Sequence, residues 1–315
     1  MLCNGLPFRS SAPAKIILLG EHAVVYGMPA IAAPIHSLRA YACAGPSDTA
    51  LSIRSVELDK RVAIDAPVPD DSARAMQRLL QITCDYFGVR KPTGDLVIRS
   101  DIPFAAGLGS GAAVSAAAIR ALAALFGRRI PNEDLNQLVF EMEKIHHGTP
   151  SGIDNTVVVY ERPVYFERGK DLDLLTVERS CRIVIADTGC ATMTRDAVGR
   201  IRQRYNQRQS DTQEAFLRIG QVARDARHAL ESGKQRRLGA LMSENHRLLR
   251  HLGISSPELD KLVDASIAAG AMGAKLSGGG MGGNIIALVD RSTVQAVRRA
   301  LSLAGAVSVI DFVMN

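Results

Sequence analysis

The spacing of hydrophobic positions predicts that the first third of the chain combines strands with one amphipathic helix. Apolar residues cluster or alternate at 12–20, 30–34, 38–44 and 50–58, and each of these runs predicts a strand. Between residues 70 and 87 the apolar positions recur every three or four residues, which is the period of a helix. We therefore expect an antiparallel sheet and a helix in this part of the chain.

The middle of the chain predicts a strand, a glycine-rich loop and two helices. The strand is expected at 96–100, and Pro103 ends it because proline has no N–H to donate to a neighbouring strand. An alanine-rich helix is expected from Ser110, and a second helix over residues 131–147. The valine-rich run at 157–160 predicts another strand.

The second half of the chain predicts helices that cover an antiparallel sheet. The expected strands are 182–186, 284–289 and 307–313. The expected helices are 194–231, 235–250, 257–269 and 293–303, with a glycine-rich loop at 273–283. This layout belongs to the α+β class, and we place the domain boundary so that the two domains span residues 1–180 and 181–315.

Composition excludes several classes of protein. A chain of 315 residues with 47% hydrophobic and 22% charged residues is typical of a globular protein with two cores. The net charge of +6 suits a small anionic substrate, and the arginines between 200 and 208 have only Tyr205 among them, so we expect a solvated helix face and no nucleic-acid partner. No apolar stretch reaches the roughly 20 residues that a membrane helix needs, so no membrane partner is expected.

The cysteines favour a reducing compartment. Their number is odd, their spacings are wide and no C-x-x-C occurs; they are Cys3, Cys43, Cys84, Cys181 and Cys190. We therefore expect reduced thiols, no zinc site and a cytoplasmic location.

The strongest local signal for chemistry is the loop that leads into the helix at Ser110. Gly107, Gly109 and Gly111 allow a tight turn, and the free N–H groups at a helix start attract anions, phosphate above all. Neither a G-x-x-x-x-G-K-[ST] loop nor a dinucleotide-binding G-x-G-x-x-G unit occurs. The glycines alone leave open a second interpretation, in which the loop is only a tight packing turn.

Two further stretches carry a recognisable pattern. Residues 12–27 read A-P-A-K-I-I-L-L-G-E-H-A-V-V-Y-G, and residues 147–155 read H-G-T-P-S-G-I-D-N. With the loops at 107–111 and 273–283, they resemble the GHMP family of small-molecule kinases, which is named after galacto-, homoserine, mevalonate and phosphomevalonate kinases. The resemblance covers nearly the whole chain, and H-G-x-P-S-G-[IV]-D-N is its more specific motif.

The resemblance implies a fold and an activity. The fold would be a two-domain α+β kinase, with an N-terminal domain like ribosomal protein S5 and a C-terminal ferredoxin-like domain. The activity would be transfer of the γ-phosphate of ATP, with Mg²⁺, to the primary hydroxyl of mevalonate, giving 5-phosphomevalonate for isoprenoid precursor synthesis. A homodimer is common in the family. Phosphomevalonate, homoserine or a sugar remain alternative acceptors, and a catalytically silent nucleotide-binding module remains an alternative function.

The resemblance also assigns roles to residues. Asp154 would accept the proton of the acceptor hydroxyl, and Lys15 would stabilise negative charge beside it. Glu143 and Ser110 would bind Mg²⁺, which prefers oxygen ligands. Substrate contacts would come from Glu21, His22 and Thr194. Contacts with ATP would come from Pro103, Ala106, Gly107, Leu108, Gly109, Ser110, Gly111 and Ala112.

The chain departs from the family pattern at several positions. Gly111 stands where a second serine is usual, so metal binding would rest on Ser110, Glu143 and water. This change is the best support for a silent module, whereas the retained Lys15 and Asp154 favour an active kinase. Further departures are Ala14, Ala105, Met281 and Asn284. A galactokinase would show E-H-x-D-Y, and Ala23 and Val24 stand where that pattern needs its Asp.

Overall fold

The computed structural model describes residues 5–103, 107–147, 150–190 and 194–315. The chain divides into two compact units. The first unit comprises Met1–Ala14, His36–Phe104 and Gly109–Glu161, and the second comprises Lys15–Ile35, Ala105–Leu108 and Arg162–Asn315. The domain boundary expected after residue 180 stays a prediction.

The strands of the first unit pair around β2 (Ala30–Ala50), which is continuous where the sequence predicted two strands. Its C-terminal half pairs antiparallel with β5 (Thr93–Ser100), which pairs in parallel with β3 (Ser52–Ser55). The hairpin partner of β3 is β4 (Lys60–Ala63). Pro34 lies between the stretch of β2 that pairs with β6 and the stretch that pairs with β5, and β1 also pairs with β2.

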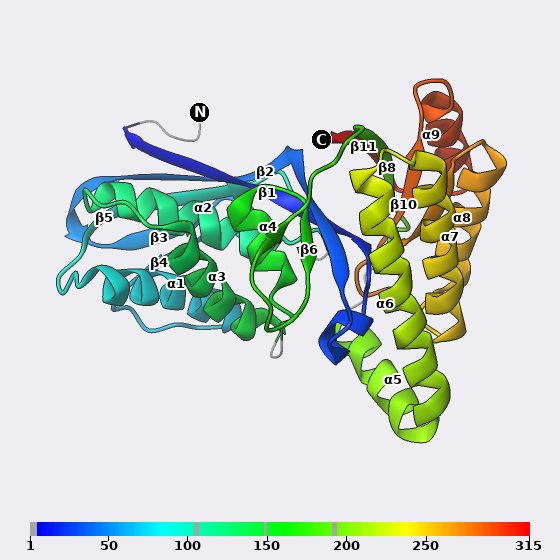
Figure 1. Cartoon of the computed structure of the whole chain (residues 1–315). Coiled ribbons are helices and arrows are strands. Elements are labelled where there is room, and N and C mark those ends of the chain that lie inside the picture. The colour runs from blue at the N-terminus through cyan, green and yellow to red at the C-terminus, as the bar shows by residue number, and fades with distance from the viewer. Residues whose placement is uncertain (1–4, 104–106, 148–149, 191–193) are drawn as a thin grey trace. The chain divides into compact units, whose positions relative to one another are not determined.

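Helices complete the first unit among its described residues (Figure 1). They are α1 (Asp71–Phe87), α2 (Ser110–Leu125), α3 (Asn132–His147) and α4 (Ile153–Tyr160). The predicted start of α1 is confirmed, since the Asp70 carboxylate accepts the N–H of Ala73 as an N-cap. Helix α2 contacts α1, α3, α4 and β5, and its many alanines allow this close packing on several sides.

The strand predicted at 157–160 is wrong, because these residues form the second half of α4. Gly152 precedes the helix in a left-handed conformation, and Asp154 supplies an acidic residue to its first turn. Val157, Val158 and Val159 are buried, and α4 packs against both α2 and α3. Tertiary packing therefore outweighs the strand preference of the valines.

The second unit contains a four-stranded antiparallel sheet in the order β11-β8-β10-β9, as expected for the second half of the chain. The strands are β8 (Cys181–Asp187), β9 (Gly273–Ser277), β10 (Asn284–Val289) and β11 (Ser308–Met314). In the register of the central strand, Ile286 lies opposite Ile185 on one side and Lys275 on the other. Separately, the start of β2 pairs with β6 (Val164–Phe166), which pairs with β7 (Asp173–Leu174).

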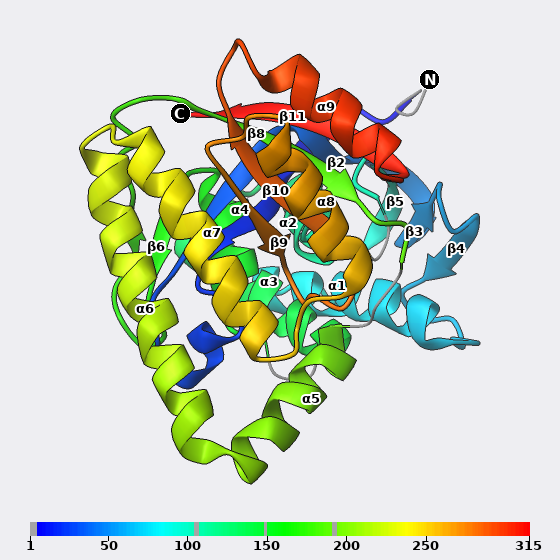
Figure 2. The same cartoon turned by 90° about the vertical axis from the view of Figure 1, so that its right-hand side faces the viewer.

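Helices cover one face of this sheet. Figure 2 shows α7 (Gln235–His251), α8 (Pro257–Ala268) and α9 (Val294–Leu303) over the strands that they contact. Helix α6 (Gln209–Glu231) lies beside α7 (Figure 1). The remaining helices of this unit are the short 3₁₀ helix η1 (Ala23–Tyr26) and α5 (Thr194–Gln207). The region predicted as one helix from 194 to 231 is thus two helices, because the backbone at Arg208 is not helical.

Two other sequence expectations need correction. Residues 273–277, predicted as part of a glycine-rich loop, form the buried strand β9. Cys43 is disulfide-bonded, so the expectation of five reduced thiols is wrong at this position, while Cys84, Cys181 and Cys190 are free. The α+β class itself is confirmed by the helices and sheets of both units.

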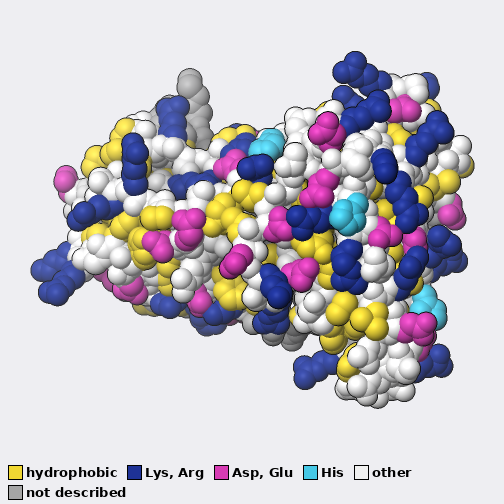
Figure 3. All heavy atoms as spheres, viewed as in Figure 1, with side chains coloured by type: hydrophobic (Ala, Val, Ile, Leu, Met, Phe, Trp, Pro, Cys, Tyr) yellow, Lys and Arg dark blue, Asp and Glu magenta, His cyan; other side chains and the backbone are white. Residues whose placement is uncertain are grey.

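The surface carries charges of both signs. On the face drawn in Figure 3, Lys and Arg side chains are interspersed with Asp and Glu side chains. Among the described residues, no helix combines the length and the apolar character needed to cross a lipid bilayer.

Candidate active site

The predicted phosphate loop leads directly into a helix. Ser110 is the first residue of α2, and Gly109 precedes it with a φ of 73°, a left-handed conformation that glycine adopts without strain. The amides in the first turn of α2, at Ser110, Gly111 and Ala112, have no carbonyl partner within the helix. They therefore offer donors and a positive helix end to a phosphate group.

Gly107 and Leu108, in the N-terminal part of this loop, belong to the second unit. The carbonyl of Leu108 accepts the backbone N–H of Lys15 at 2.9 Å. Gly107 has a φ of 71°, and a Cβ atom placed on Gly278 would lie 3.9 Å from its carbonyl oxygen. The glycine-rich turn after β9 thus lies next to the phosphate loop. Pro103 is exposed, and Ala106 lies outside the described residues.

Two candidate carboxylates of the first unit lie on neighbouring helices. Glu143 is on α3 and only 2% exposed, and Asp154 is in the first turn of α4 and partly exposed. The positive end of α4 favours a negative charge on Asp154. Lys15 is 3% exposed on β1 (Phe8–Leu19). Because Lys15 and Asp154 belong to different units, their predicted pairing stays a prediction.

The turn after β1 is anchored by a buried ion pair. The Glu21 carboxylate is paired with the ammonium group of Lys275 on β9, and the two side chains are 1% and 0% exposed. Asn245 on α7 donates its amide N–H to the other Glu21 oxygen at 3.1 Å. Burial lowers the pKa of Lys275, and the negative charge of Glu21 opposes that shift. Such a pair is costly to bury, so it must be satisfied by hydrogen bonds to persist.

His22 follows Glu21 in a left-handed backbone conformation, with a φ of 61°. Its Nε2 atom lies 2.9 Å from the carbonyl oxygen of Gly279. Burial lowers the pKa of His22 to about 4, so the ring is neutral at pH 7. Because a carbonyl only accepts, Nε2 carries the proton and Nδ1 is left as an acceptor. His22 thus has the form suited to accept a hydrogen bond from a hydroxyl group.

Sequence reasoning missed Lys275 and Asn245. A lysine is almost never fully buried unless it is paired, so a lysine inside the apolar strand β9 is a signal in itself. We did not expect a buried lysine there, because the sequence predicted that residues 273–277 belong to a loop. Asn245 has no comparable local signal on α7. Thr194 is the first residue of α5, and its side chain lies outside the described residues.

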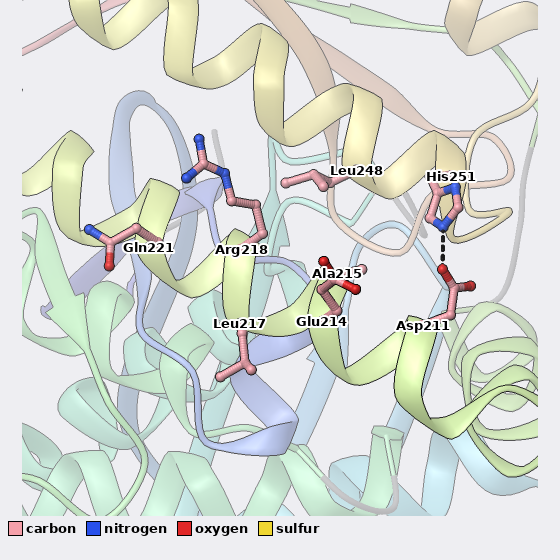
Figure 4. A pocket seen from close by; sticks show the side chains of 8 residues that line it. All are labelled: Asp211, Glu214, Ala215, Leu217, Arg218, Gln221, Leu248 and His251. Carbon is pink, nitrogen blue, oxygen red and sulfur yellow. Dashed lines mark hydrogen bonds and ion pairs between the residues drawn. The ribbon is translucent and has the colours of Figure 1, made fainter.

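A hollow of about 520 Å³ lies elsewhere in the second unit, between α6 and α7 (Figure 4). Asp211 on α6 accepts a hydrogen bond from Arg204 at 2.8 Å and faces Nε2 of His251 at 2.9 Å. Hydrogen bonds from His251 and Arg204 lower the pKa of Asp211. None of the candidate residues is among the described residues that line this hollow, so we assign it no role in the reaction.

Known proteins resemble this chain over almost its full length. It is 36% identical to the mevalonate kinase of Thermococcus gammatolerans, with 96% of this chain and 94% of the relative covered. The family model "GHMP kinases N terminal domain" matches residues 73–162, and "GHMP kinases C terminal" matches residues 226–307. The chain belongs to the GHMP kinase family.

A further relative and a solved structure are also similar to this GHMP kinase. It is 35% identical to the mevalonate kinase of Thermococcus sibiricus, again with 96% of this chain and 94% of the relative covered. The crystal structure of L. major mevalonate kinase in complex with R-mevalonate is 27% identical, with a TM-score of 0.82 over 98% of this chain and 95% of that chain. The two-domain GHMP kinase fold and the α+β class are therefore established for this chain.

Magnesium fits the donors that the kinase offers. Glu143 supplies a buried carboxylate and Ser110 a hydroxyl, and both are the oxygen ligands that Mg²⁺ prefers. The described residues contain no group of three His, Cys, Asp or Glu side chains that would hold a metal ion alone. This agrees with a Mg²⁺ site in which the protein contributes one or two ligands and phosphate oxygens contribute others.

Proposed function

We propose that this GHMP kinase phosphorylates mevalonate on its primary hydroxyl, with ATP as donor, and yields 5-phosphomevalonate. The observation that carries this proposal is the identity of about 35% to mevalonate kinases over 96% of the chain. The motifs that contain Lys15 and Asp154 are retained, which favours an active kinase over a silent module. The product would enter isoprenoid precursor synthesis.

The proposed mechanism uses positioning and charge stabilisation, because phosphoryl transfer requires little covalent chemistry from the protein. The first-turn amides of α2 bind the phosphates of ATP, with Pro103, Ala106, Gly107, Leu108 and Gly109 completing the nucleotide contacts. Glu143 and Ser110 would hold Mg²⁺, which would neutralise charge on the phosphate oxygens. Asp154 accepts the proton of the attacking hydroxyl, and Lys15 stabilises the negative charge that develops.

Glu21, His22 and Thr194 are the proposed contacts to mevalonate. Support for His22 comes from its neutral ring, whose Nδ1 is available as an acceptor. Besides this proposed contact, the bonds of Glu21 to Lys275 and Asn245 would hold the turn that carries His22. We also propose a homodimer, which is common in the family. The cytoplasmic location and the domains of residues 1–180 and 181–315 are proposed from the sequence itself.

An acceptor panel tests the proposed function. ADP release is measured with Mg-ATP and, in separate reactions, mevalonate, 5-phosphomevalonate, homoserine and galactose. We expect kcat/KM for mevalonate to exceed that for every other acceptor by at least about 100-fold. A higher kcat/KM for one of the others would overturn the substrate assignment and keep the kinase assignment. Nucleotide binding without ADP release on any acceptor would overturn both.

A further inference from the structure

The proposed reaction depends on how two helices of the first unit are aligned. Helix α3 carries Glu143, the proposed magnesium ligand, and α4 carries Asp154, the proposed base. The two helices pack directly against each other. Any sliding of α4 along α3 changes the separation of the two carboxylates, and misplacement by about 1 Å can cost a factor of about 100 in rate.

Polar contacts around Asn155 join the two helices in their partly buried interface. The amide of Asn155, which is 3% exposed, donates from Nδ2 to Oδ1 of Asn136 at 2.7 Å and to its backbone oxygen at 3.3 Å. Asn136 in turn approaches the Thr156 hydroxyl oxygen from Nδ2 at 3.5 Å. The Thr156 hydroxyl donates to the carbonyl of Gly152 at 2.7 Å, which completes a polar chain from α3 to the start of α4.

This contact has a defined relation to both carboxylates. Asn136 and Glu143 are seven residues apart on α3, which is about two turns, so both lie on one face and about 10 Å apart along the axis. Asn155 directly follows Asp154 on α4. Further along α4, the Tyr160 hydroxyl lies 3.5 Å from Glu133, so the helices run in opposite directions. The level at which Asn155 meets Asn136 therefore sets the axial separation of Glu143 and Asp154.

A hydrophobic interface alone would specify the axial register of α4 on α3 only weakly. Apolar side chains pack acceptably in more than one register, whereas the buried amide of Asn155 meets its acceptor on Asn136 in only one. The arrangement has a cost here, because Oδ1 of Asn155 is buried and has no hydrogen-bond partner among the described residues. A polar pair retained at such a cost, next to the proposed base, points to a role in alignment rather than in stability alone.

We propose that Asn136 and Asn155 are positioning residues that fix the register of α4 on α3 and thereby the separation of Asp154 from Glu143. The inference rests on the proposed function for the meaning of these two carboxylates. Neither asparagine is assigned a direct contact with substrate, nucleotide or metal. Their effect on the reaction is carried by the two helices.

The test replaces the amide pair with an apolar pair of nearly the same shape. The double variant Asn136→Leu/Asn155→Leu removes both side-chain amides at once and leaves the Thr156 hydroxyl bonded to the carbonyl of Gly152, so it should unfold within about 3 °C of the wild type. We expect its kcat to fall about 10- to 100-fold, while KM for ATP and for mevalonate change by less than about threefold. The free Mg²⁺ concentration that gives half-maximal rate should rise. A wild-type kcat at wild-type stability would overturn the proposal.

Two further variants complete the experiment. Thr83→Val removes another buried hydroxyl of the first unit, which bonds only within α1, and should leave kcat unchanged. Should the leucine pair fail to fold, Asn136→Gln supplies the test, because it keeps the amide and moves it by one methylene group. Asn136→Gln should lower kcat at near-normal stability. An unchanged kcat in a folded Asn136→Gln enzyme would then count against the proposal.

A crystal structure of the leucine pair gives a readout that does not depend on activity. We expect α4 to shift along α3 by about 1 Å or more, or to occupy more than one register. An unshifted single register would overturn the inference whatever the kinetics. If the wild type fails to phosphorylate mevalonate, the proposed function fails, yet this structure still decides whether the amide pair sets the register.

Discussion

Asp154 and His22 show how much of the role of a single residue can be predicted from the sequence. Asp154 was predicted from its motif alone, and the structure adds that it lies in the first turn of a helix, where negative charge is favoured. His22 was predicted as a substrate contact, and the structure adds its neutral state and strained backbone. Neither property has a local sequence signal, because both depend on residues such as Gly279 that are remote in the chain.

The role of Asp154 gives the first prediction. Asp154→Asn should lower kcat by about 10²- to 10⁴-fold, because the amide cannot accept the hydroxyl proton, while the dissociation constant for ADP stays near the wild-type value. An assay of ADP release measures kcat, and calorimetric titration with Mg-ADP measures the dissociation constant. Asp171→Asn, an exposed aspartate, serves as the control. Wild-type turnover by Asp154→Asn would contradict the assigned role.

His22 gives a prediction about pH. Its pKa is about 4 in the folded chain and 6.5 unfolded, so above pH 6.5 neither state binds the proton. As the pH falls from 6.5 to 4, the unfolded state takes up the proton first, and the free energy of unfolding should fall by about 3 kcal/mol. Urea unfolding at several pH values measures this loss. His22→Asn, which tolerates the positive φ, should remove that part of the pH dependence, whereas replacing the exposed His36 should not.

At the scale of elements, prediction from the sequence succeeded where signals within a few residues decide the structure and failed where packing against distant segments decides it. The start of α1 and the junction of the phosphate loop with α2 follow from capping and glycine chemistry, both of which act within a few residues. Helix α4 was misread because a run of valines favours a strand unless neighbouring helices bury it. Strand β9 was misread because Lys275 and the adjacent glycines conceal a buried strand.

The link between β9 and the turn after β1 gives a prediction at this scale. Lys275→Met should lower the free energy of unfolding by about 3–5 kcal/mol, because it leaves the buried Glu21 carboxylate without its counter-ion. The double variant Lys275→Met/Glu21→Leu should regain most of that loss. Lys144→Met, which breaks an exposed pair with Glu141, should cost about 0.5 kcal/mol or less. A Lys275→Met protein as stable as the Lys144→Met control would contradict the structural role of the pair.

At the scale of the whole molecule, the family could be predicted from the sequence because its motifs are local and ordered. The stretches at 12–27, 107–111 and 147–155 each carry a signal that requires no knowledge of the fold. The α+β class followed from element periods. The division into two compact units did not, because segments such as Lys15–Ile35 join a unit whose other residues lie far along the chain. Long-range pairing of this kind leaves no trace in local periodicity.

The central claim is that the chain transfers the γ-phosphate of ATP to the primary hydroxyl of mevalonate. The most direct measurement is phosphorus NMR of the product formed from mevalonate and Mg-ATP, with Asp154→Asn as the inactive control. The account predicts one new phosphate monoester whose phosphorus couples to the protons of the terminal methylene group, in equal amount to the ADP released. A phosphate on the tertiary hydroxyl, or ADP formed with no phosphorylated mevalonate, would contradict it.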